Sequence, residues 1–387
     1  MERAGVTDMI IKNASVYTED GRFVPKDIYI EGDQFVDCEQ KVSDKTEIDG
    51  TGCYAIPGLT DIHFHGCVGY DFCDGTREAI DAMAAYEASV GVTNIVPATM
   101  TLGEDTLLEI CKAAKAYREE GRQEKRARLC GINMEGPFVA PSKKGAQNGN
   151  FIRMPDMEMF DKLNEASGNM VKLIAIAPEV EGAMEFIEQR HEKVVMSLAH
   201  TAADYDTAIC AFEKGASHVT HLYNAMNPYT HRAPGVVGAA ADTEKAEVEL
   251  ICDGVHIHPA AVRTTFKIFG DDRIILISDS MMATGLEDGD YSLGGQAVKV
   301  VGNLATLKDG TIAGSATNLM DCVRTVVLKM GIPLESAVKC AAVNSAKSVG
   351  IYDQYGSITP GKKANVVLLK KEDLALKQVI IEGENIS

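Results

Sequence analysis

The sequence predicts an α/β fold, a closed (β/α)8 barrel of the TIM type, together with a small β-sandwich domain built from both ends of the chain. Two observations predict the barrel. Eight short apolar runs alternate with helix-like stretches through the middle of the chain, and such alternation implies a parallel sheet. Residues able to bind a metal or move a proton follow several of these runs, and barrel enzymes place their chemistry at the carboxyl ends of the strands. An open doubly wound sheet is the alternative, but it gives no reason for ligands to gather from so many strands.

The eight apolar runs are rich in β-branched and aliphatic residues, as expected for strands that are buried on both faces. They cover residues 59–65, 94–99, 129–135, 171–177, 194–200, 217–222, 247–253 and 273–279. Helical spacing of apolar residues predicts helices over 77–90, 106–117, 157–166, 183–190 and 205–214. A (β/α)8 barrel typically needs about 250 residues, and we assign residues 58–358 to it.

The two ends of the chain have the pattern of short strands with turn signals. Residues 9–17 and 27–33 are examples, and residues 19–21 form a plausible hairpin turn between them. Residues 365–369 and 378–383 repeat the pattern near the other end. Since neither end supplies enough strands for a stable sheet alone, we predict one small β domain from residues 1–57 and 359–387.

Composition limits the classes of partner. The 387 residues carry a net charge of −18, which argues against a general nucleic-acid surface. The ten cysteines contain no C-x-x-C pair, as expected for a chain in a reducing compartment. We find no segment that resembles a signal peptide or reaches transmembrane length. We therefore expect a cytoplasmic chain that binds neither nucleic acid nor membrane.

The first candidate site residues are His63 and His65, at the end of the first predicted strand. Residues two apart in a strand point the same way, and neutral imidazole is a preferred ligand of zinc and related metals. Alone, this pair equally fits two surface histidines on an edge strand. Later apolar runs end in further ligand or proton-transfer residues, namely Glu135, His200, His221 and Asp279. We therefore expect one or two divalent metals per chain, zinc first, with iron, manganese or cobalt as alternatives.

Several longer strings then identify a family. They read MEGPF at 134–138, SLAHT at 197–201, THLYNAM at 220–226, RAPG at 232–235, CDGVH at 252–256 and IAGS at 312–315. In this order, and over nearly the whole chain, they resemble the amidohydrolase superfamily. Within it they are similar to the N-acetylglucosamine-6-phosphate deacetylase family.

The resemblance implies a role for each matching residue. Glu135, His200 and His221 match the main metal ligands of the family. His63 and His65 match a pair that, where present, allows a second metal, with Glu135 bridging. Asp279 matches the catalytic aspartate. The sugar-phosphate contacts and the lining of the site match Ala146, Asn224, Ala225, Arg232, His256, Ile312, Ala313 and Gly314.

The family also implies a reaction and an assembly. The reaction is metal-dependent hydrolysis of the acetamide of N-acetyl-D-glucosamine 6-phosphate to D-glucosamine 6-phosphate and acetate, in amino-sugar catabolism or recycling. The epimer N-acetylgalactosamine 6-phosphate and a cyclic amide stay open as substrates. Members act as dimers whose phosphate contacts are completed across the interface, so we expect a homodimer. A non-catalytic relative would be expected to lack Asp279 or a ligand, and this chain has all of them.

Three residues call for separate interpretation. Arg232 can bind phosphate through two parallel hydrogen bonds, although a lone arginine is more often a solvated loop residue. Gln147 stands where many relatives carry a histidine that polarises the substrate carbonyl. Because an amide carries no charge, either Gln147 does a weaker version of that job or a second metal takes it over. His218 would point away from His221 in a strand, and we interpret it as structural.

Overall fold

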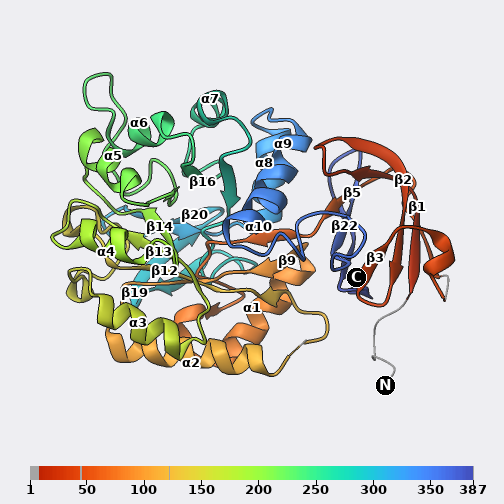
Figure 1. Cartoon of the computed structure of the whole chain (residues 1–387), viewed down its shortest axis with the longest axis horizontal. Helices are drawn as coiled ribbons and strands as arrows, with labels where there is room; N and C mark the ends of the chain where they lie inside the picture. The colour runs from red at the N-terminus through yellow and green to blue at the C-terminus, as the bar shows by residue number, and fades with distance from the viewer. Residues whose placement is uncertain (1–7, 44–45, 122, 387) are drawn as a thin grey trace.

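The computed structural model describes residues 8–43, 46–121 and 123–386. Residues 1–7, 44–45 and 387 of the predicted terminal domain therefore lie outside the described residues. Figure 1 shows two parts, a large barrel with its helices and, beside it, a sheet to which both ends of the chain contribute.

The barrel has eight parallel strand positions, of which the second and third are each formed by two short strands in succession. Its strands are β6 (Leu59–Asp61), β9 (Val92–Ile95) with β10 (Ala98–Thr99), β11 (Arg128–Leu129) with β12 (Ile132–Phe138), β13 (Val171–Ile176), β14 (Val195–Leu198), β15 (His218–Val219), β16 (Glu247–Ile251) and β17 (Ile274–Ile277). The last strand position returns to the first, where the Asp279 amide donates to the His63 carbonyl at 2.9 Å and the His65 amide donates to the Ser280 carbonyl at 2.7 Å. The predicted closed barrel is confirmed.

Helices cover the outside of the barrel (Figure 1). Five of them follow the predicted ranges: α1 (Arg77–Ser89), α2 (Glu104–Glu119), α3 (Met157–Ala166), α4 (Ala183–Arg190) and α5 (Tyr205–Glu213). Side-chain caps fix where several begin, as where Asp156 accepts from the Met159 amide at 3.0 Å and Asp204 accepts from the Thr207 amide at 2.9 Å. Among the described helices, none combines the length and the apolar character that a membrane span requires.

The sequence patterns gave no prediction for the later helices. These are α6 (Gly235–Asp242), α7 (Pro259–Phe269), α8 (Leu319–Leu328), α9 (Leu334–Val338) and α10 (Asn344–Ser348), with a π-helical turn over Lys339–Val343. Helix α6 reads GVVGAAAD and is buried over its first six residues. A helix that is apolar nearly all round shows no amphipathic period, which explains why α6 is hard to detect.

A four-stranded antiparallel sheet, also without a prediction, follows the last barrel strand. It consists of β18 (Gly289–Leu293), β19 (Gln296–Val301), β20 (Leu304–Thr306) and β21 (Ile312–Ser315). Its apolar face packs against Met100 and Met281, which lie beside the barrel mouth. The Ser315 amide donates to the Asp279 carbonyl at 2.7 Å, so β21 is joined directly to the end of the last barrel strand. A short hairpin, β7 (Gly66–Cys67) and β8 (Tyr70–Asp71), lies after the first barrel strand.

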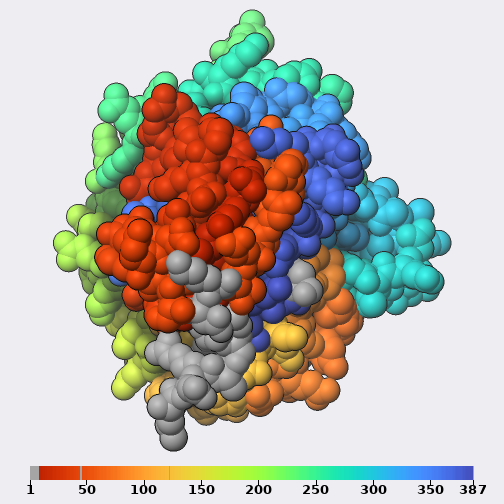
Figure 2. Space-filling view, turned by 90° about the vertical axis from the view of Figure 1, so that its right-hand side faces the viewer, coloured from red at the N-terminus to blue at the C-terminus, as the bar shows by residue number. Residues whose placement is uncertain are grey.

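Both ends of the chain form one eight-stranded sheet, in the order β24-β23-β22-β5-β1-β2-β3 with β4 on β1. The strands are β1 (Met9–Tyr17), β2 (Phe23–Glu31), β3 (Gln34–Val36), β4 (Thr46–Asp49), β5 (Cys53–Pro57), β22 (Val366–Lys370), β23 (Leu376–Ile381) and β24 (Glu384–Asn385). Strand β5 pairs antiparallel with β22, where Ala55 faces Leu368. Figure 2 shows the red N-terminal and dark blue C-terminal residues side by side on this face.

The terminal sheet encloses a small core of its own, which includes Ile11, Val16, Ile30, Val366 and Leu368. Strand β1 pairs with β4 through its first residues and with β5 near its end. The sheet therefore branches at β1, and its strands close around this separate apolar cluster. The barrel has its own, larger core.

Candidate active site

The six predicted metal-binding and proton-transfer residues converge at the carboxyl end of the barrel. They form two groups within which the ligand atoms lie no more than 4.8 Å apart: His63, His65 and Asp279 in one, and Glu135, His200 and His221 in the other. All six side chains are buried, and Asp279, the most accessible, is 7% exposed. Strand ends far apart in the sequence thus supply one compact cluster.

The backbone turns sharply at three of these residues. His200, His221 and Asp279 have φ values of 45°, 31° and 49°. This left-handed conformation costs a residue other than glycine about 1–3 kcal/mol and persists only where its surroundings impose it. Here hydrogen bonds from neighbouring loops hold it, such as the Ala140 amide on the His200 carbonyl at 2.9 Å. The turn takes each side chain out of the alternation of its strand at the barrel mouth.

Glu135 lies between the two groups. Its Oε1 is 3.0 Å from His200 Nε2 and 2.9 Å from His221 Nε2, and these two ring nitrogens are 3.2 Å apart. Its Oε2 is 3.1 Å from His65 Nε2. Asp279 Oδ1 in turn lies 3.3 Å from His65 Nε2 and 3.7 Å from His63 Nε2. One carboxylate therefore faces both groups, as a bridging ligand must.

The donor atoms suit divalent cations. His200 Nδ1 lies 2.9 Å from the Lys143 carbonyl, so this nitrogen carries the proton of the neutral ring. The lone pair of its Nε2 then faces the Glu135 carboxylate with no proton between them. His63 Nε2 is buried and has no hydrogen-bond partner among the described residues. Lone pairs and carboxylate oxygens that converge without a donor are the arrangement that a metal ion satisfies.

The charges of the buried groups also favour a bound cation. Burial by itself would lower the pKa of His65, but the Asp279 and Glu135 carboxylates outweigh burial and raise that pKa to about 10. The histidine rings around Glu135 likewise hold its carboxyl pKa well below the ordinary value, against the effect of burial. Two buried carboxylates thus make this end of the barrel strongly favourable for positive charge.

The sequence interpretation missed Glu249, which supports the site from β16. Glu249 is fully buried, and its Oε2 lies 2.9 Å from His63 Nδ1 and accepts from the His221 amide at 3.1 Å. Its Oε1 lies 3.0 Å from His218 Nε2. The neighbouring rings of His63 and His218 hold the pKa of Glu249 well below its ordinary value, although burial opposes them. A carboxylate on the far nitrogen of a histidine fixes which nitrogen is free to bind a metal. The signal in the sequence was an acidic residue inside the apolar run 247–253.

A cavity of about 310 Å³ opens beside the two groups. Seven predicted contact residues line it: Ala146, Gln147, Asn224, Ala225, His256, Ile312 and Gly314. Four other lining residues carried no prediction, namely Met100, Gly145, Leu293 and Thr311. Leu293 belongs to β18 and Thr311 directly precedes β21, so the unpredicted four-stranded sheet supplies part of the wall.

Gln147 is fixed in place. Its amide nitrogen donates to Glu135 Oε2 at 2.8 Å and lies 3.7 Å from Met100 Sδ, while its oxygen accepts from the Thr101 amide at 2.7 Å. Both amide hydrogens therefore have partners within the protein. Gln147 orients the carboxylate that lies between the two groups.

Two predicted contact residues lie outside this cavity. Ala313 is fully buried in the apolar cluster under the four-stranded sheet. Arg232 is exposed and lines a separate surface pocket with Asn227 and Pro234. Within the described part of the chain, its guanidinium forms no hydrogen bond or ion pair. By contrast, His256 is held towards the cavity by Asp253, whose Oδ2 lies 2.7 Å from His256 Nδ1.

Comparisons with known proteins agree with this geometry. The amidohydrolase family model matches residues 54–386. The chain is 38% identical to a Bacillus subtilis N-acetylglucosamine-6-phosphate deacetylase over 319 residues, which cover 82% of this chain and 81% of the relative. It is 34% identical to an Escherichia coli O157:H7 N-acetylgalactosamine-6-phosphate deacetylase over 329 residues, 85% of this chain and 86% of the relative.

Among solved structures, the chain is similar to a mutant N-acetyl-D-glucosamine-6-phosphate deacetylase from Mycobacterium smegmatis in complex with N-acetyl-D-glucosamine-6-phosphate. The TM-score is 0.90 and the identity is 31%, with 98% of this chain and 99% of that chain covered. The fold, the site and these similarities agree along nearly the whole sequence. The chain therefore belongs to the amidohydrolase family and, within it, to the N-acetylglucosamine-6-phosphate deacetylases.

Proposed function

We propose that this chain hydrolyses the acetamide of N-acetyl-D-glucosamine 6-phosphate to D-glucosamine 6-phosphate and acetate. The observation that carries the proposal is the arrangement of Glu135 between two histidine groups, with Asp279 beside them, at one end of a cavity of about 310 Å³. A cavity of this size suits a small ligand. The similarity to deacetylases named for this substrate supports the choice of phosphosugar.

The proposed cofactor is zinc, with two ions per chain. His63 and His65 would hold one ion, His200 and His221 the other, and Glu135 would bridge them. Asp279 would lie beside the first ion as the proton-transfer group. The hydrogen bonds of Gln147 support the second ion. Because its amide already donates to Glu135 at 2.8 Å, Gln147 is not free to polarise a substrate carbonyl, and that job falls to a metal. Iron, manganese and cobalt suit the same ligands.

Asp279 carries the proton transfers of the proposed reaction. A bound divalent metal supplies a water of lowered pKa, near 7, and stabilises negative charge on the carbonyl oxygen. Asp279 takes a proton from the attacking water as the new C–O bond forms at the acetamide carbon. It then returns that proton to the nitrogen as the C–N bond breaks, so that the amine leaves neutral. Asp279 is buried with its Oδ1 3.3 Å from His65 Nε2, so its carboxylate would lie next to the metal-bound water.

A homodimer would bring Arg232 to the phosphate. Arg232 is exposed and lies outside the cavity of its own chain, which suits a residue that completes the site of a second copy. Its planar guanidinium can bind two phosphate oxygens at once. Asn224, Ala225 and His256 would then contact the sugar phosphate from within the chain, and the backbone of residues 312–314 would line the site.

The galactose epimer is a second candidate substrate. A relative named N-acetylgalactosamine-6-phosphate deacetylase is 34% identical over 85% of this chain, a value comparable with those of the glucosamine relatives. The two sugars differ only in the direction of one hydroxyl group. The expected cytoplasmic location stays a prediction.

Acetate release tests the reaction. The purified chain is assayed on N-acetylglucosamine 6-phosphate, the unphosphorylated sugar and N-acetylgalactosamine 6-phosphate, before and after chelation and with zinc added back. Metal-dependent release from the phosphorylated glucosamine alone is the expected result. Release mainly from the galactosamine form would move the substrate to the epimer, and no release from any of the three with metal bound would refute the proposed function.

Mixed subunits test the dimer. Arg232→Ala and Asp279→Asn are each expected to be inactive as homodimers. If Arg232 acts on the partner's site, a mixed dimer regains one intact site, and equal mixing restores about a quarter of the wild-type activity. If Arg232 acts within its own chain, mixing restores nothing.

A further inference from the structure

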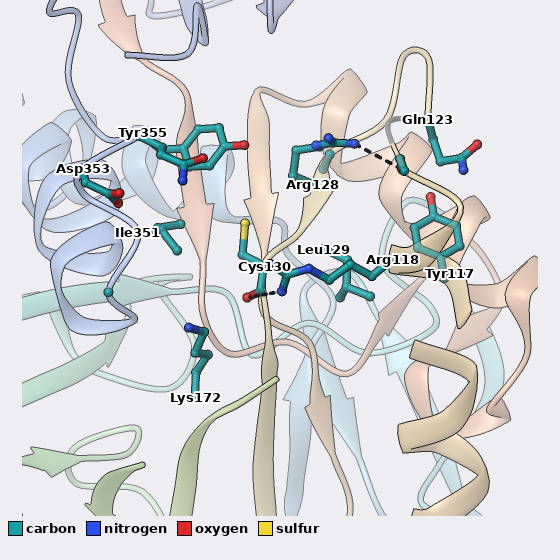
Figure 3. Close-up of a pocket in the computed structure, with 14 residues that line it drawn as sticks. Tyr117, Arg118, Gln123, Arg128, Leu129, Cys130, Lys172, Ile351, Asp353 and Tyr355 are labelled. Atoms are coloured by element: carbon teal, nitrogen blue, oxygen red, sulfur yellow. Dashed lines mark hydrogen bonds between the residues drawn. The ribbon is translucent and has the colours of Figure 1, made fainter. Parts of the chain in front are cut away.

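A second cavity, of about 360 Å³, lies at the opposite end of the barrel. Arg128 begins β11, Lys172 is the second residue of β13, and residues 350–355 follow α10. Figure 3 shows side chains from these segments, and from the end of α2, around one space. This is the amino-terminal end of the barrel strands, whereas Glu135 lies near the other end of its strand position. The cavity is therefore separate from the active site.

Three cationic side chains line this cavity: Arg118, Arg128 and Lys172. The hydrogen bond of Arg118 is a long one to the Cys130 carbonyl, at 3.4 Å, and no carboxylate among the described residues pairs with it. The ammonium group of Lys172 has no hydrogen bond or ion pair in the described part of the chain. Two positive charges thus face the cavity without a neutralising partner.

Packing and hydrogen bonds hold these cationic side chains in place. The stem of Lys172 lies against Gly131, where an added Cβ would be only 2.3 Å from Lys172 Cγ. Glu382 orients Arg128, because the Nε of Arg128 lies 3.0 Å from the buried carboxylate oxygen Oε1 of Glu382. The Tyr355 hydroxyl donates to the same oxygen at 2.9 Å. Each cationic side chain is therefore held by packing or by a hydrogen bond and does not extend freely into solvent.

Glu382 neutralises Arg128, but the other nearby acidic groups do not pair with Arg118 or Lys172. Glu119 lies 3.9 Å from Lys115, and Glu120 lies 2.9 Å from Arg77, so both are paired on the outside of α2. Asp353 also lines the cavity, and Figure 3 shows it on the same side of the view as Lys172 and across from Arg118. Among the described residues it forms no ion pair with either cation. In a chain with a net charge of −18, a local excess of positive charge in a cavity runs against the general composition.

We propose that this cavity binds a small phosphate monoester with a sugar-sized body. Arg118 and Lys172 line one cavity, and guanidinium and ammonium groups are the usual partners of phosphate oxygens. A volume of about 360 Å³ lies in the range of small-molecule sites. Ile351 and Leu129 offer apolar surface to the body of the ligand. Gln354 lines the cavity and is exposed, so its side chain offers an amide at the solvent side. The site is distinct from the proposed catalytic function and does not depend on it.

Equilibrium dialysis of the metal-loaded protein with labelled glucose 6-phosphate tests the site. This probe has no acetamide and is not hydrolysed. The double variant Arg118→Gln, Lys172→Gln removes the two unpaired charges. The control variant Lys267→Gln, Lys329→Gln removes two exposed charges far from the cavity. We expect the double variant to bind one equivalent fewer than the wild type and the control, or to bind it at least about tenfold more weakly. Equal binding by all three proteins overturns the proposal.

A single tryptophan then locates the bound ligand. The chain has no tryptophan, so Gln354→Trp places one fluorophore at the rim of this cavity. Glucose 6-phosphate is expected to change its fluorescence saturably, glucose is not, and the Arg118→Gln, Lys172→Gln background is expected to weaken the response in step with the dialysis. A response that is unchanged in that background places the ligand elsewhere and overturns the proposal.

Discussion

Replacing Glu249 by glutamine should weaken metal binding without touching a metal ligand. Glu249 makes three contacts in the structure, with His63 Nδ1 at 2.9 Å, His218 Nε2 at 3.0 Å and the His221 amide at 3.1 Å. In the variant one carboxylate oxygen becomes an NH2 group. Wherever that group points, it meets a nitrogen that now donates to Glu249.

The magnitude follows from the ring of His63. With an amide NH2 against Nδ1, the ring must carry its proton on Nε2, the atom that lies 3.6 Å from Glu135 and 3.7 Å from Asp279. The lone pair required by the metal is then lost. Where the NH2 group faces His218 instead, an uncharged oxygen replaces the carboxylate on His63 Nδ1, and the ring becomes a weaker ligand. Substitutions of such supporting carboxylates cost about 10- to 100-fold in metal affinity, which corresponds to about 1.4–2.8 kcal/mol.

The assay is metal content per chain after dialysis against buffers of graded free zinc. Glu247→Gln is the matched control, because Glu247 lies on the same strand, 3.7 Å from His218 Nδ1 and away from His63. Thermal unfolding of each variant checks that it folds. If Glu249→Gln folds and keeps the wild-type zinc content at every free zinc concentration, the proposed orientation of His63 by Glu249 is wrong.

Three further predictions follow from named contacts. Asp279→Asn should fold, keep its metal and lose about 10²- to 10⁴-fold in turnover. The assay is acetate release, compared with the metal content of the same sample. Near-normal turnover would contradict the role of Asp279 as base and acid. Chelation should lower Tm, since a tenfold to hundredfold excess of metal over Kd contributes about 1.4–2.7 kcal/mol, and zinc should restore it; an unchanged Tm would contradict the fit of the donor atoms. Glu87 is fully buried with no hydrogen bond to either oxygen among the described residues, and burial raises the pKa of its carboxyl well above the ordinary value. The folded chain then holds a proton that the unfolded chain releases above about pH 4.3. The free energy of unfolding therefore falls as pH rises above that value. Glu87→Gln should reduce the fall of Tm with pH, whereas the exposed Glu78→Gln should not.

The barrel and the cluster of candidate metal-binding residues could be predicted because each depends on local sequence. Residues 9–17 have the composition of a short strand followed by turn residues, and β1 has these bounds. The candidate metal-binding residues each follow a short apolar run. The four-stranded sheet after Asp279 had a usable signal in β19, where buried and exposed residues alternate, but no motif drew attention to it. The sequence prediction therefore left out part of the cavity wall.

Glu249 could not be assigned a role from sequence for a different reason. Its function depends on which strands are neighbours, since His218 on β15 lies beside Glu247 on β16 in the register of the barrel. A single acidic residue in an apolar run does not indicate whether it faces a histidine, water or the core. The same holds for Arg232, whose position outside the cavity is a property of the assembled loop and not of the RAPG string.

The pairing of β5 with β22 also determines when the terminal sheet can form. These strands are separated by the entire barrel in the chain, so during synthesis β5 leaves the ribosome long before its partner exists. Synthesis at about 5–20 residues per second leaves the edge of β5 unpaired while the barrel strands emerge, and an unpaired edge is a site of unwanted association. Contacts so distant in sequence also slow folding. The last strands of this chain therefore act as a closing step, and a chain shortened before β22 would present an open sheet edge to the quality-control machinery.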